Sequence, residues 1–395
     1  MTGGRVLRCL LVVFLCGLAA SVGLWAAAPV ITGVSIPDVT MRINDVVVAT
    51  ILTQSDSATT FTLSASNIGG YALGGLSRID STTYTATFTV AEFGSDYAAA
   101  AAIPVSVTLT DGSTPNTWST PISQGNDLLD ANRPAAPSTP DLASGSDLGE
   151  FSTDNITRDN TPELDGTAEA NGTVEVSSSV SGSLGTTTAP GGAWAFTVLG
   201  GAALSDGIHN LSARVTDGAG NVGPWSAALA VLIDTQAPPA PGGRSPADAT
   251  LTNDNTPTFS WAAPIDPGDS GIRDYRIVLA GPSSRASYPE ATTYTPDSLL
   301  DGSYTWYVYA RDVAGNTGTS SSTWDLDIDT LNPTVTVAII DASLSDTDPA
   351  SSVTFTFSEA TTDFTVGDVA VVGGAISAFG GSGTSYWATF TATDG

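Results

Sequence analysis

Aspartate and asparagine recur in matching loops at a fixed distance along this chain. Asp217 is followed by Ala219-Gly220-Asn221 and Asp312 by Ala314-Gly315-Asn316, so the two loops are 95 positions apart (312 minus 217). Carboxylate, amide and backbone carbonyl oxygens are the ligands of hard cations such as calcium, which takes about six to eight of them. The same residues also form turns without any metal, because they tolerate left-handed backbone and bond their own backbone. Each loop taken alone is therefore either a turn or part of a calcium site.

The 95-residue spacing extends well beyond these two loops. Three further pairs of motifs share it: Asp159-Asn160-Thr161-Pro162 with Asp254-Asn255-Thr256-Pro257, Asp206-Gly207 with Asp301-Gly302, and Ile233-Asp234-Thr235 with Ile328-Asp329-Thr330. A period of this length, with strand patterning inside it, indicates tandem domains rather than a solenoid.

Between the motifs, apolar and polar residues alternate with a period of two. This alternation predicts β-strands with one buried face, and no amphipathic helical run longer than two turns interrupts them. The clearest inward-facing rows are His209, Leu211, Ala213 and Val215, then Tyr304, Trp306, Val308 and Ala310, and then Trp324, Leu326 and Ile328. Such patterning is typical of an all-β sandwich.

The two units are similar to the bacterial Ig-like repeats of large surface proteins. The similarity rests on four motifs together: Thr161-Pro162, Asp206-Gly207 followed by His209, Ala219-Gly220-Asn221, and Asp234-Thr235, each with its counterpart 95 positions later. Residues 242–333 also resemble a fibronectin type III unit, which has the same sandwich architecture. The resemblance implies that calcium stiffens some members of the family.

The predicted fold is all-β, with tandem immunoglobulin-like β-sandwich domains in an extended array and the last domain truncated. The sequence stops at Asp394-Gly395, before any further Ala-Gly-Asn loop, which is why the last domain is expected to be partial. The predicted order is a signal peptide (1–28), a divergent Ig-like domain (29–133), a linker (134–147), a bacterial Ig-like domain (148–241), an Ig-like or fibronectin III-like domain (242–333) and a partial bacterial Ig-like domain (334–395).

Strand direction in such a sandwich predicts where the loop oxygens meet. In a seven-strand sandwich the first turn and the chain exit lie at one pole, and the turn between strands six and seven lies at the other. End-to-end stacking would bring together acidic side chains that repel each other unless a cation neutralises them. We therefore predict calcium between the second and third domains, held by Asp154, Asp159, Asp234, Asp312 and Asn316. The preceding junction would place Asp217 and Asn221 opposite Asp127 and Asp130.

Composition excludes several classes of catalyst. Cys9 and Cys16 both lie in the leader, and all twelve basic residues are arginine, so thiolate catalysis, cysteine-ligated zinc and a Schiff-base lysine are excluded. His209 is the only histidine, and it takes the inward position that Tyr304 has in the next repeat, so we predict a core residue. A carboxylate pair of the glycosidase type has no support beyond abundance. No catalytic residue is predicted, and the chain is not expected to be an enzyme.

The start of the chain predicts export. Arg5 and Arg8 precede an apolar run over residues 10–20, and small residues end it at 26–28, as in a signal peptide. The 19 uncharged residues of 10–28 could instead stay as a membrane anchor. Without the two leader arginines the net charge changes from −28 to about −30 (10 minus 40), which argues against nucleic acid as a partner.

The predicted function is that of a secreted or cell-surface structural or adhesive stalk, a fragment of a larger surface protein. Its expected partners are a surface glycan or protein, another copy of itself, and downstream domains of the same polypeptide. The alternative is a carbohydrate- or protein-binding accessory region of a secreted hydrolase. A sugar-binding platform would use exposed tryptophans, for which the candidates are Trp194, Trp225, Trp261 and Trp387.

Overall fold

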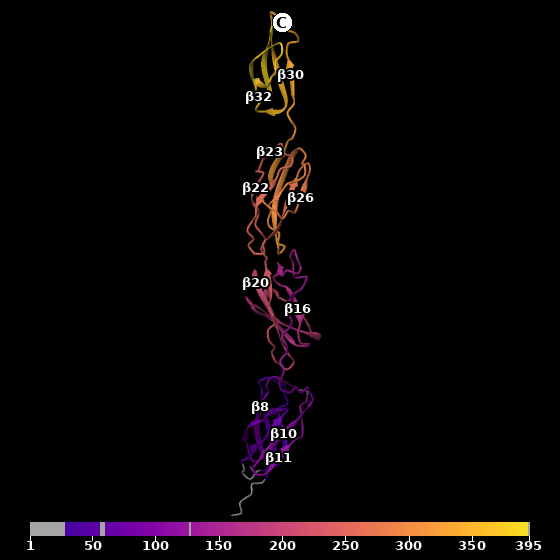
Figure 1. Cartoon of the computed structure of the whole chain (residues 1–395), viewed down its shortest axis with the longest axis vertical. Coiled ribbons are helices and arrows are strands. Elements are labelled where there is room, and N and C mark those ends of the chain that lie inside the picture. The colour runs from indigo at the N-terminus through magenta and orange to yellow at the C-terminus, as the bar shows by residue number, and fades with distance from the viewer. Residues whose placement is uncertain (1–27, 56–59, 126–127, 394–395) are drawn as a thin grey trace, which may run out of the picture. The chain divides into compact units, whose positions relative to one another are not determined.

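The computed structural model describes residues 28–55, 60–125 and 128–393, and the regular structure there is β-strand with three short 3-10 helices (Figure 1). The all-β prediction is confirmed. The predicted signal peptide lies, except for Ala28, outside the described residues, as does Asp127. The chain forms two compact units, Met1–Asp234 and Thr235–Gly395. Among the described residues, no helix is long and apolar enough to cross a membrane.

The first sandwich of unit 1 has a four-stranded sheet in the order β1-β3-β8-β7 facing strands ordered β11-β10-β5-β6, with β4 also paired to β10. Its core includes Met41, Ile51, Tyr84 and Leu109. Two further short pairs are formed by β12 with β9, antiparallel, and by β13 with β2, parallel. The strands are β1 (Ile31–Ser35), β2 (Met41–Arg42), β3 (Val46–Thr53), β4 (Thr62–Leu63), β5 (Asn67–Ile68), β6 (Tyr71–Ala72), β7 (Gly74–Arg78), β8 (Thr83–Thr89), β9 (Ala102–Ile103), β10 (Val105–Thr110), β11 (Pro115–Trp118), β12 (Ile122–Ser123) and β13 (Leu129–Asp130).

The second sandwich completes unit 1 with a three-stranded sheet, β14-β16-β19, and a five-stranded sheet, β15-β21-β20-β17-β18. β15 pairs in parallel with β21, so the first long segment of the domain crosses from one sheet to the other. The elements are β14 (Asp141–Leu142), β15 (Ile156–Thr157), β16 (Glu163–Thr167), β17 (Thr173–Ser178), β18 (Gly182–Thr188), η1 (Pro190–Gly192), β19 (Ala193–Thr197), η2 (Gly200–Ala202), β20 (Gly207–Thr216) and β21 (Leu229–Ile233).

The third sandwich, in unit 2, repeats this strand order element for element. Its sheets are β22-β24-β27 and β23-β29-β28-β25-β26, again with one parallel pair, β23 with β29. The 95-residue sequence repeat is therefore a repeat of one topology. The strands are β22 (Gly242–Ser245), β23 (Thr250–Thr252), β24 (Phe259–Ala262), β25 (Ile272–Ala280), β26 (Arg285–Ser287), β27 (Thr293–Tyr294), β28 (Gly302–Asp312) and β29 (Trp324–Ile328).

His209 is buried, as the strand alternation predicts. Its Nε2 donates a hydrogen bond to the carbonyl of Ser205 (2.9 Å), four residues earlier, and its Nδ1 accepts one from Ser178 Oγ (2.8 Å). The carbonyl can only accept, so the proton is on Nε2. In the third sandwich the Tyr304 hydroxyl donates to the carbonyl of Leu300 (2.9 Å), also four residues earlier. The imidazole therefore performs the same structural task as the tyrosine.

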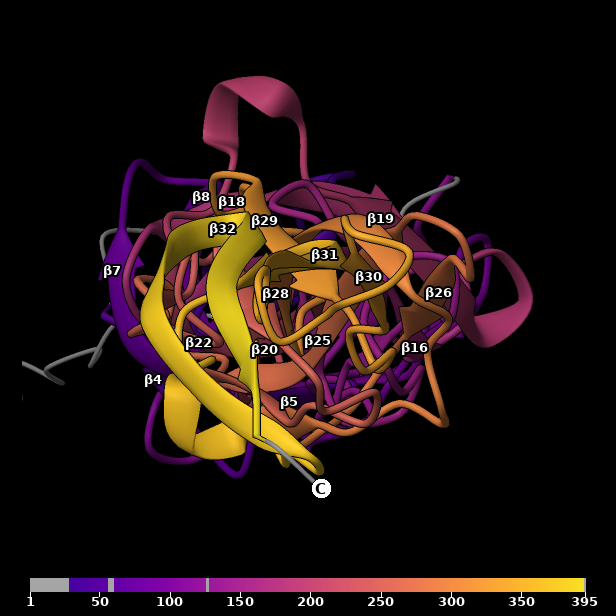
Figure 2. The ribbon, with the colours of Figure 1, turned by 90° about the horizontal axis from the view of Figure 1, so that it is seen from above.

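The last described region forms one three-stranded sheet, β30-β31-β32, with β30 (Val335–Ile339), β31 (Ala350–Thr361), η3 (Val366–Asp368) and β32 (Gly374–Ala392). Figure 2 shows β32 as a long curved ribbon beside β31. The register of this pair shifts between Thr356 and Thr361, opposite a stretch of β32 where Gly381 and Gly383 have positive φ. Such a bulge bends a strand and increases its twist. The predicted truncation of this domain stays a prediction.

The linker predicted over residues 134–147 needs correction in its second half. β14 pairs with β16, and Ser146 and Asp147 are buried. Ser146 accepts at its carbonyl from the hydroxyl of Thr157 (2.5 Å), and its own Oγ accepts from the backbone N–H of Glu163 (2.9 Å). Proline and serine here are compatible with a short edge strand, because an edge leaves one row of backbone groups unpaired. Composition alone therefore misidentified the start of the second sandwich.

Trp306 tests the assignment of the inward face. It is fully buried, and its ring makes edge-to-face contacts with Phe259 (4.9 Å between centroids) and Trp324 (5.9 Å). We expect Trp306→Ala to lower the free energy of unfolding of the third sandwich by about 3–5 kcal/mol, as large-to-small core changes do. Chemical denaturation followed by fluorescence measures this. The exposed Leu251→Ala, in the same sandwich, is the control and should change stability by less than about 0.5 kcal/mol. A loss below about 1 kcal/mol for Trp306→Ala would contradict the assignment.

Candidate functional site

The repeated Asp-Ala-Gly-Asn loop is organised by its aspartate. Asp217 Oδ1 accepts hydrogen bonds from the backbone N–H groups of Ala219 (2.9 Å), Gly220 (2.8 Å) and Asn221 (2.8 Å). Asn221 also donates from its side chain to Asp217 Oδ2 (3.0 Å). Gly220 has φ 93°, a conformation that favours glycine. The aspartate and asparagine therefore form the turn themselves.

The loop in the third sandwich is built in the same way. Asp312 Oδ1 accepts from the backbone N–H of Asn316 (2.7 Å), and Asp312 Oδ2 accepts from the Asn316 side chain (2.9 Å). The Asn316 amide also donates to the carbonyl of Gln236 (3.4 Å). The turn-forming role is thus common to both repeats, and it leaves open whether the carboxylates also bind a cation.

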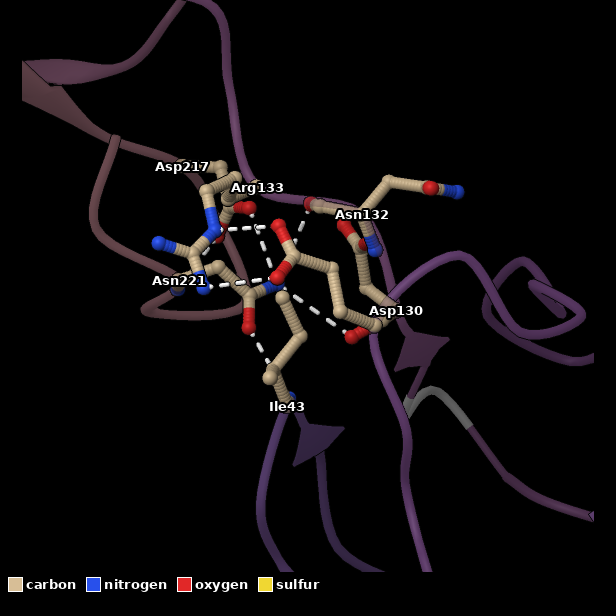
Figure 3. Close-up of polar contacts among 7 residues, drawn as sticks. Ile43, Asp130, Asn132, Arg133, Asp217 and Asn221 are labelled. Carbon is tan, nitrogen blue, oxygen red and sulfur yellow. Dashed lines mark hydrogen bonds and ion pairs between the residues drawn. The ribbon is translucent and has the colours of Figure 1, made fainter. Parts of the chain in front are cut away.

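In unit 1, Asn221 connects the second sandwich to the first (Figure 3). Its Oδ1 accepts from the backbone N–H of Ile43 (2.9 Å), and its Nδ2 donates to the carbonyls of Asp130 (3.2 Å) and Asn132 (3.4 Å). Arg42 adds a bond from its Nη1 to the carbonyl of Gly220 (2.9 Å). Asn221 is buried, and its donors and its acceptor are all used. The sequence predicted that Asn221 faces Asp130, and the contact is made through the backbone of Asp130.

Carboxylates surround this junction. Burial raises the pKa of Asp130, and the charges of Asp217 and Asp96 add to the effect, while the backbone N–H of Asn132 opposes it. Desolvation, with Asp217 and Asp130 as neighbours, likewise raises the pKa of Glu169. Asp96 also holds the exit segment, accepting from the N–H of Ala131 (2.8 Å) and from the side chain of Asn132. Sequence reasoning missed Glu169 and Asp96, because neither belongs to a repeated motif.

Unit 2 contains a pair of buried carboxylates. Asp266, in the loop between β24 and β25, is 8% exposed, and one of its oxygens lies within 4.8 Å of one from the buried Asp312. Asp266 Oδ2 accepts from Ser270 Oγ (3.1 Å) and the N–H of Gly271 (2.7 Å). Asp266 Oδ1 is buried and accepts no hydrogen bond from any described residue. Two buried carboxylates this close favour a bound cation or a shared proton.

The other predicted ligands are placed in unit 1. Asp154 accepts from the N–H of Ile156 (3.1 Å), and Asp159 from the N–H (2.9 Å) and hydroxyl (3.1 Å) of Thr161, so both form local turns. Asp234 is fully buried at the end of the unit. Calcium binding by Asp154, Asp159, Asp234, Asp312 and Asn316 stays a prediction, as it does for Asp127, Asp130, Asp217 and Asn221.

Asp147 is a further buried carboxylate that the sequence did not indicate. Desolvation is the main cause that raises its pKa, and the charges of Asp154 and Asp141 contribute. Its Oδ2 accepts from the N–H of Asn155 (3.4 Å), and no described residue donates to its Oδ1. The residue was missed because residues 134–147 read as a linker.

The tryptophan platform is not present as predicted. Trp194 and Trp261 are 3% and 4% exposed and belong to the cores of their sandwiches. Trp225 is partly exposed, but the Arg214 guanidinium covers it at 4.5 Å from the ring centroid. Trp387 alone among the four is about half exposed without such a cover in the described structure. The inward position of Trp194 and Trp261 on their strands explains the error.

Comparison with known proteins places most of the chain in one family. Models of the bacterial Ig-like domain match residues 134–235, 240–330 and 329–395. The chain is 35% identical over 116 residues to exoglucanase B of Cellulomonas fimi and 31% identical over 121 residues to exoglucanase A of the same organism, covering 28% and 29% of this chain. It spans only 10% and 13% of the length of these relatives.

Among solved structures, the fibronectin(III)-like modules of Clostridium thermocellum CbhA align with a TM-score of 0.30 at 16% identity, over 48% of this chain and 94% of that one. The family assignment rests on the domain models, whose matches coincide with the repeated topology of the second and third sandwiches. This chain therefore belongs to the bacterial Ig-like domain proteins.

Proposed function

We propose that the chain is an extracellular spacer, a structural stalk of Ig-like repeats in a secreted or surface-attached protein. The observation that carries the proposal is the buried Asn221, whose amide bonds the first and second sandwiches together through both of its polar atoms. A spacer needs junctions that resist bending, whereas independent binding modules work with loose linkers. A flexible linker would leave such a side chain in water.

Export of the chain is favoured by its leader sequence, in which Arg5 and Arg8 precede an apolar run over residues 10–20. Outside the leader it has no cysteine, and it has no lysine, so neither disulfides nor lysine crosslinks contribute to its stiffness. Packing and hydrogen bonds at the junctions, or a bound metal, must supply it. The free ends of such a spacer would carry the further domains of the polypeptide, and its surface would contact a glycan, a protein or another copy.

A second candidate function is that of a non-catalytic region in a secreted hydrolase, which the similarity to two exoglucanases favours. The spacer role is compatible with it, because a non-catalytic region can also hold the domains of one polypeptide apart. We expect the purified chain to release no reducing sugar from soluble β-glucan, while the same substrate is hydrolysed by a control endoglucanase. Release at a rate proportional to the concentration of this chain would contradict the non-catalytic assignment.

We also propose that calcium contributes to the stiffness of the third sandwich, through Asp266 and Asp312. Asp266 offers a buried oxygen without a hydrogen-bond donor, and Asp312 offers a second carboxylate within 4.8 Å. Both are anionic oxygen ligands of the kind that calcium binds. A cation would remove the repulsion between them and stabilise the native state over the unfolded chain.

Asn221→Ala tests the junction. The change leaves the backbone N–H of Ile43 without its acceptor in a partly buried place, which costs about 1 kcal/mol or more and should open the junction locally. Hydrogen exchange of the peptide that contains Ile43 should become roughly five-fold faster or more. Asn210→Ala, at an exposed position in the same sandwich, is the matched control and should leave that exchange unchanged. Equal exchange in the Asn221 variant and the parent chain would refute the role of Asn221 in joining the two sandwiches.

Calcium titration of the whole chain tests the carboxylate pair. We expect unit 2 to melt at a higher temperature in calcium than in chelator. When calcium is at 100 times its Kd, binding should add about 2.7 kcal/mol to the free energy of unfolding. Asp266→Asn should abolish the response. Asp254→Asn removes an exposed carboxylate of the same sandwich and should keep it. The calcium proposal fails if the parent chain shows no shift, or if Asp266→Asn still responds.

A further inference from the structure

A row of large side chains lies on the outer face of the five-stranded sheet in the third sandwich. On β25, Tyr275, Ile277 and Leu279 are buried, so the alternating Arg276 and Val278 point away from the core. On the neighbouring strand β28, Arg276 pairs with Tyr309 and Val278 pairs with Tyr307. The outer face of β25 and β28 is therefore lined by one arginine and two tyrosines around a valine.

Tyr288 extends this row on the other side of β25. Val278 pairs with Ala286 of β26, and Tyr288 directly follows the last residue of that strand, Ser287. Tyr288 is 59% exposed. Arg276 and Tyr309 lie on adjacent strands and Tyr288 lies at the end of the next one, so at about 4.8 Å per strand the row spans roughly 10 Å. We call Arg276, Tyr288, Tyr307 and Tyr309 the tyrosine–arginine row.

Arg276 is held between aromatic rings. Its guanidinium carbon lies 5.4 Å from the centroid of Tyr288 and 5.7 Å from that of Tyr309. Its Nη1 donates to the hydroxyl of Tyr309 (2.6 Å). Stacking on rings and this one bond fix the plane of the guanidinium and leave its other terminal nitrogen for a ligand.

The charge of Arg276 is not neutralised by a carboxylate anywhere in the described structure. Its neighbours differ, because Arg273 pairs with Glu290 (2.9 Å) and Arg311 makes a two-bond pair with Asp274 (2.5 and 3.2 Å). In a chain with 40 acidic and 12 basic residues, a partner for Arg276 would be easy to supply. An arginine surrounded by tyrosines instead presents a planar cation to an outside anion.

We propose that the tyrosine–arginine row binds an acidic polysaccharide, a sugar chain that carries carboxylates. The carboxylate of one sugar would accept hydrogen bonds from Arg276, and the flat face of the adjacent ring would pack on exposed Tyr288. The row is about as long as a disaccharide. This gives the proposed spacer a ligand and does not depend on the stiffness of its junctions.

The surroundings of the row favour a sugar chain over an acidic protein. A stable protein interface needs about 800 Å² on each side with an apolar centre. Here the strip is bordered by the two arginine–carboxylate pairs and, on β29, by Asp325 and Asp327. A polysaccharide needs only the narrow strip itself. The net charge of −28 repels an anionic ligand only weakly at the row, because salt screens charges more than about 8 Å away at physiological ionic strength.

Affinity electrophoresis and calorimetry of the whole chain with polygalacturonate test the inference. We expect binding that weakens as salt is added, and a loss of about ten-fold or more in affinity for Arg276→Gln, equivalent to about 1.4 kcal/mol. Tyr288→Ala should also weaken binding. Because the Tyr288 side chain is exposed, its loss should not unfold the sandwich. Arg285→Gln is the matched control, because Arg285 pairs with Leu279 and so lies on the opposite side of β26 from Ala286.

Three results would overturn the inference. Absence of binding to polygalacturonate would mean that the row only stabilises the sheet. Equal binding to neutral hydroxyethylcellulose, unaffected by Arg276→Gln, would remove the role of charge. Tighter binding to poly-glutamate than to polygalacturonate would identify an acidic protein partner. Thermal melts of each variant confirm folding, and none of these results bears on the exchange measurement at Ile43.

Discussion

The interaction on which the rest depends is a carboxylate that accepts the backbone of its own loop. The Asp217 carboxylate accepts hydrogen bonds from three successive N–H groups at a tight turn with left-handed Gly220, where most backbone groups cannot join a strand. The turn then presents Asn221 at the end of the second sandwich, where its amide reaches Ile43 and the carbonyl of Asp130. One short motif thus closes a domain and forms the contact to its neighbour. A change that distorts this turn would therefore also disturb the junction.

The parts that could be predicted from sequence are those fixed by strand alternation and by the 95-residue repeat. Alternation placed His209 and Trp306 in the core, because a period of two leaves only two faces and one must be buried. The repeat predicted that His209 substitutes for Tyr304, and both side chains bond a carbonyl four residues earlier. Errors arose where alternation was not applied, as for Trp194, or where composition replaced it, as for β14.

The remaining features lie in loops or depend on pairing between strands. Asp147, Glu169 and Asp266 belong to loops whose lengths differ between repeats, so no fixed offset marks them. The tyrosine–arginine row requires the register of β25 against β26 and β28, which joins Arg276 to residues 12 and 33 positions away (288 minus 276 and 309 minus 276). Residues that face each other across neighbouring strands cannot be identified from sequence spacing until the strand pairing is known.

The loops before β17 and β25 explain why a cation is proposed in only one of them. In unit 1, Gly172 donates to the backbone carbonyl of Glu169 (3.1 Å), so the longer glutamate side chain stays exposed. In unit 2, Gly271 donates instead to the side chain of Asp266 (2.7 Å). That bond draws the shorter carboxylate into the fold beside Asp312. A buried anion is costly unless it is paired, and here an oxygen of a second buried carboxylate lies within 4.8 Å. The calcium proposal is therefore confined to the loop that the side chain of its acidic residue, rather than the backbone, closes.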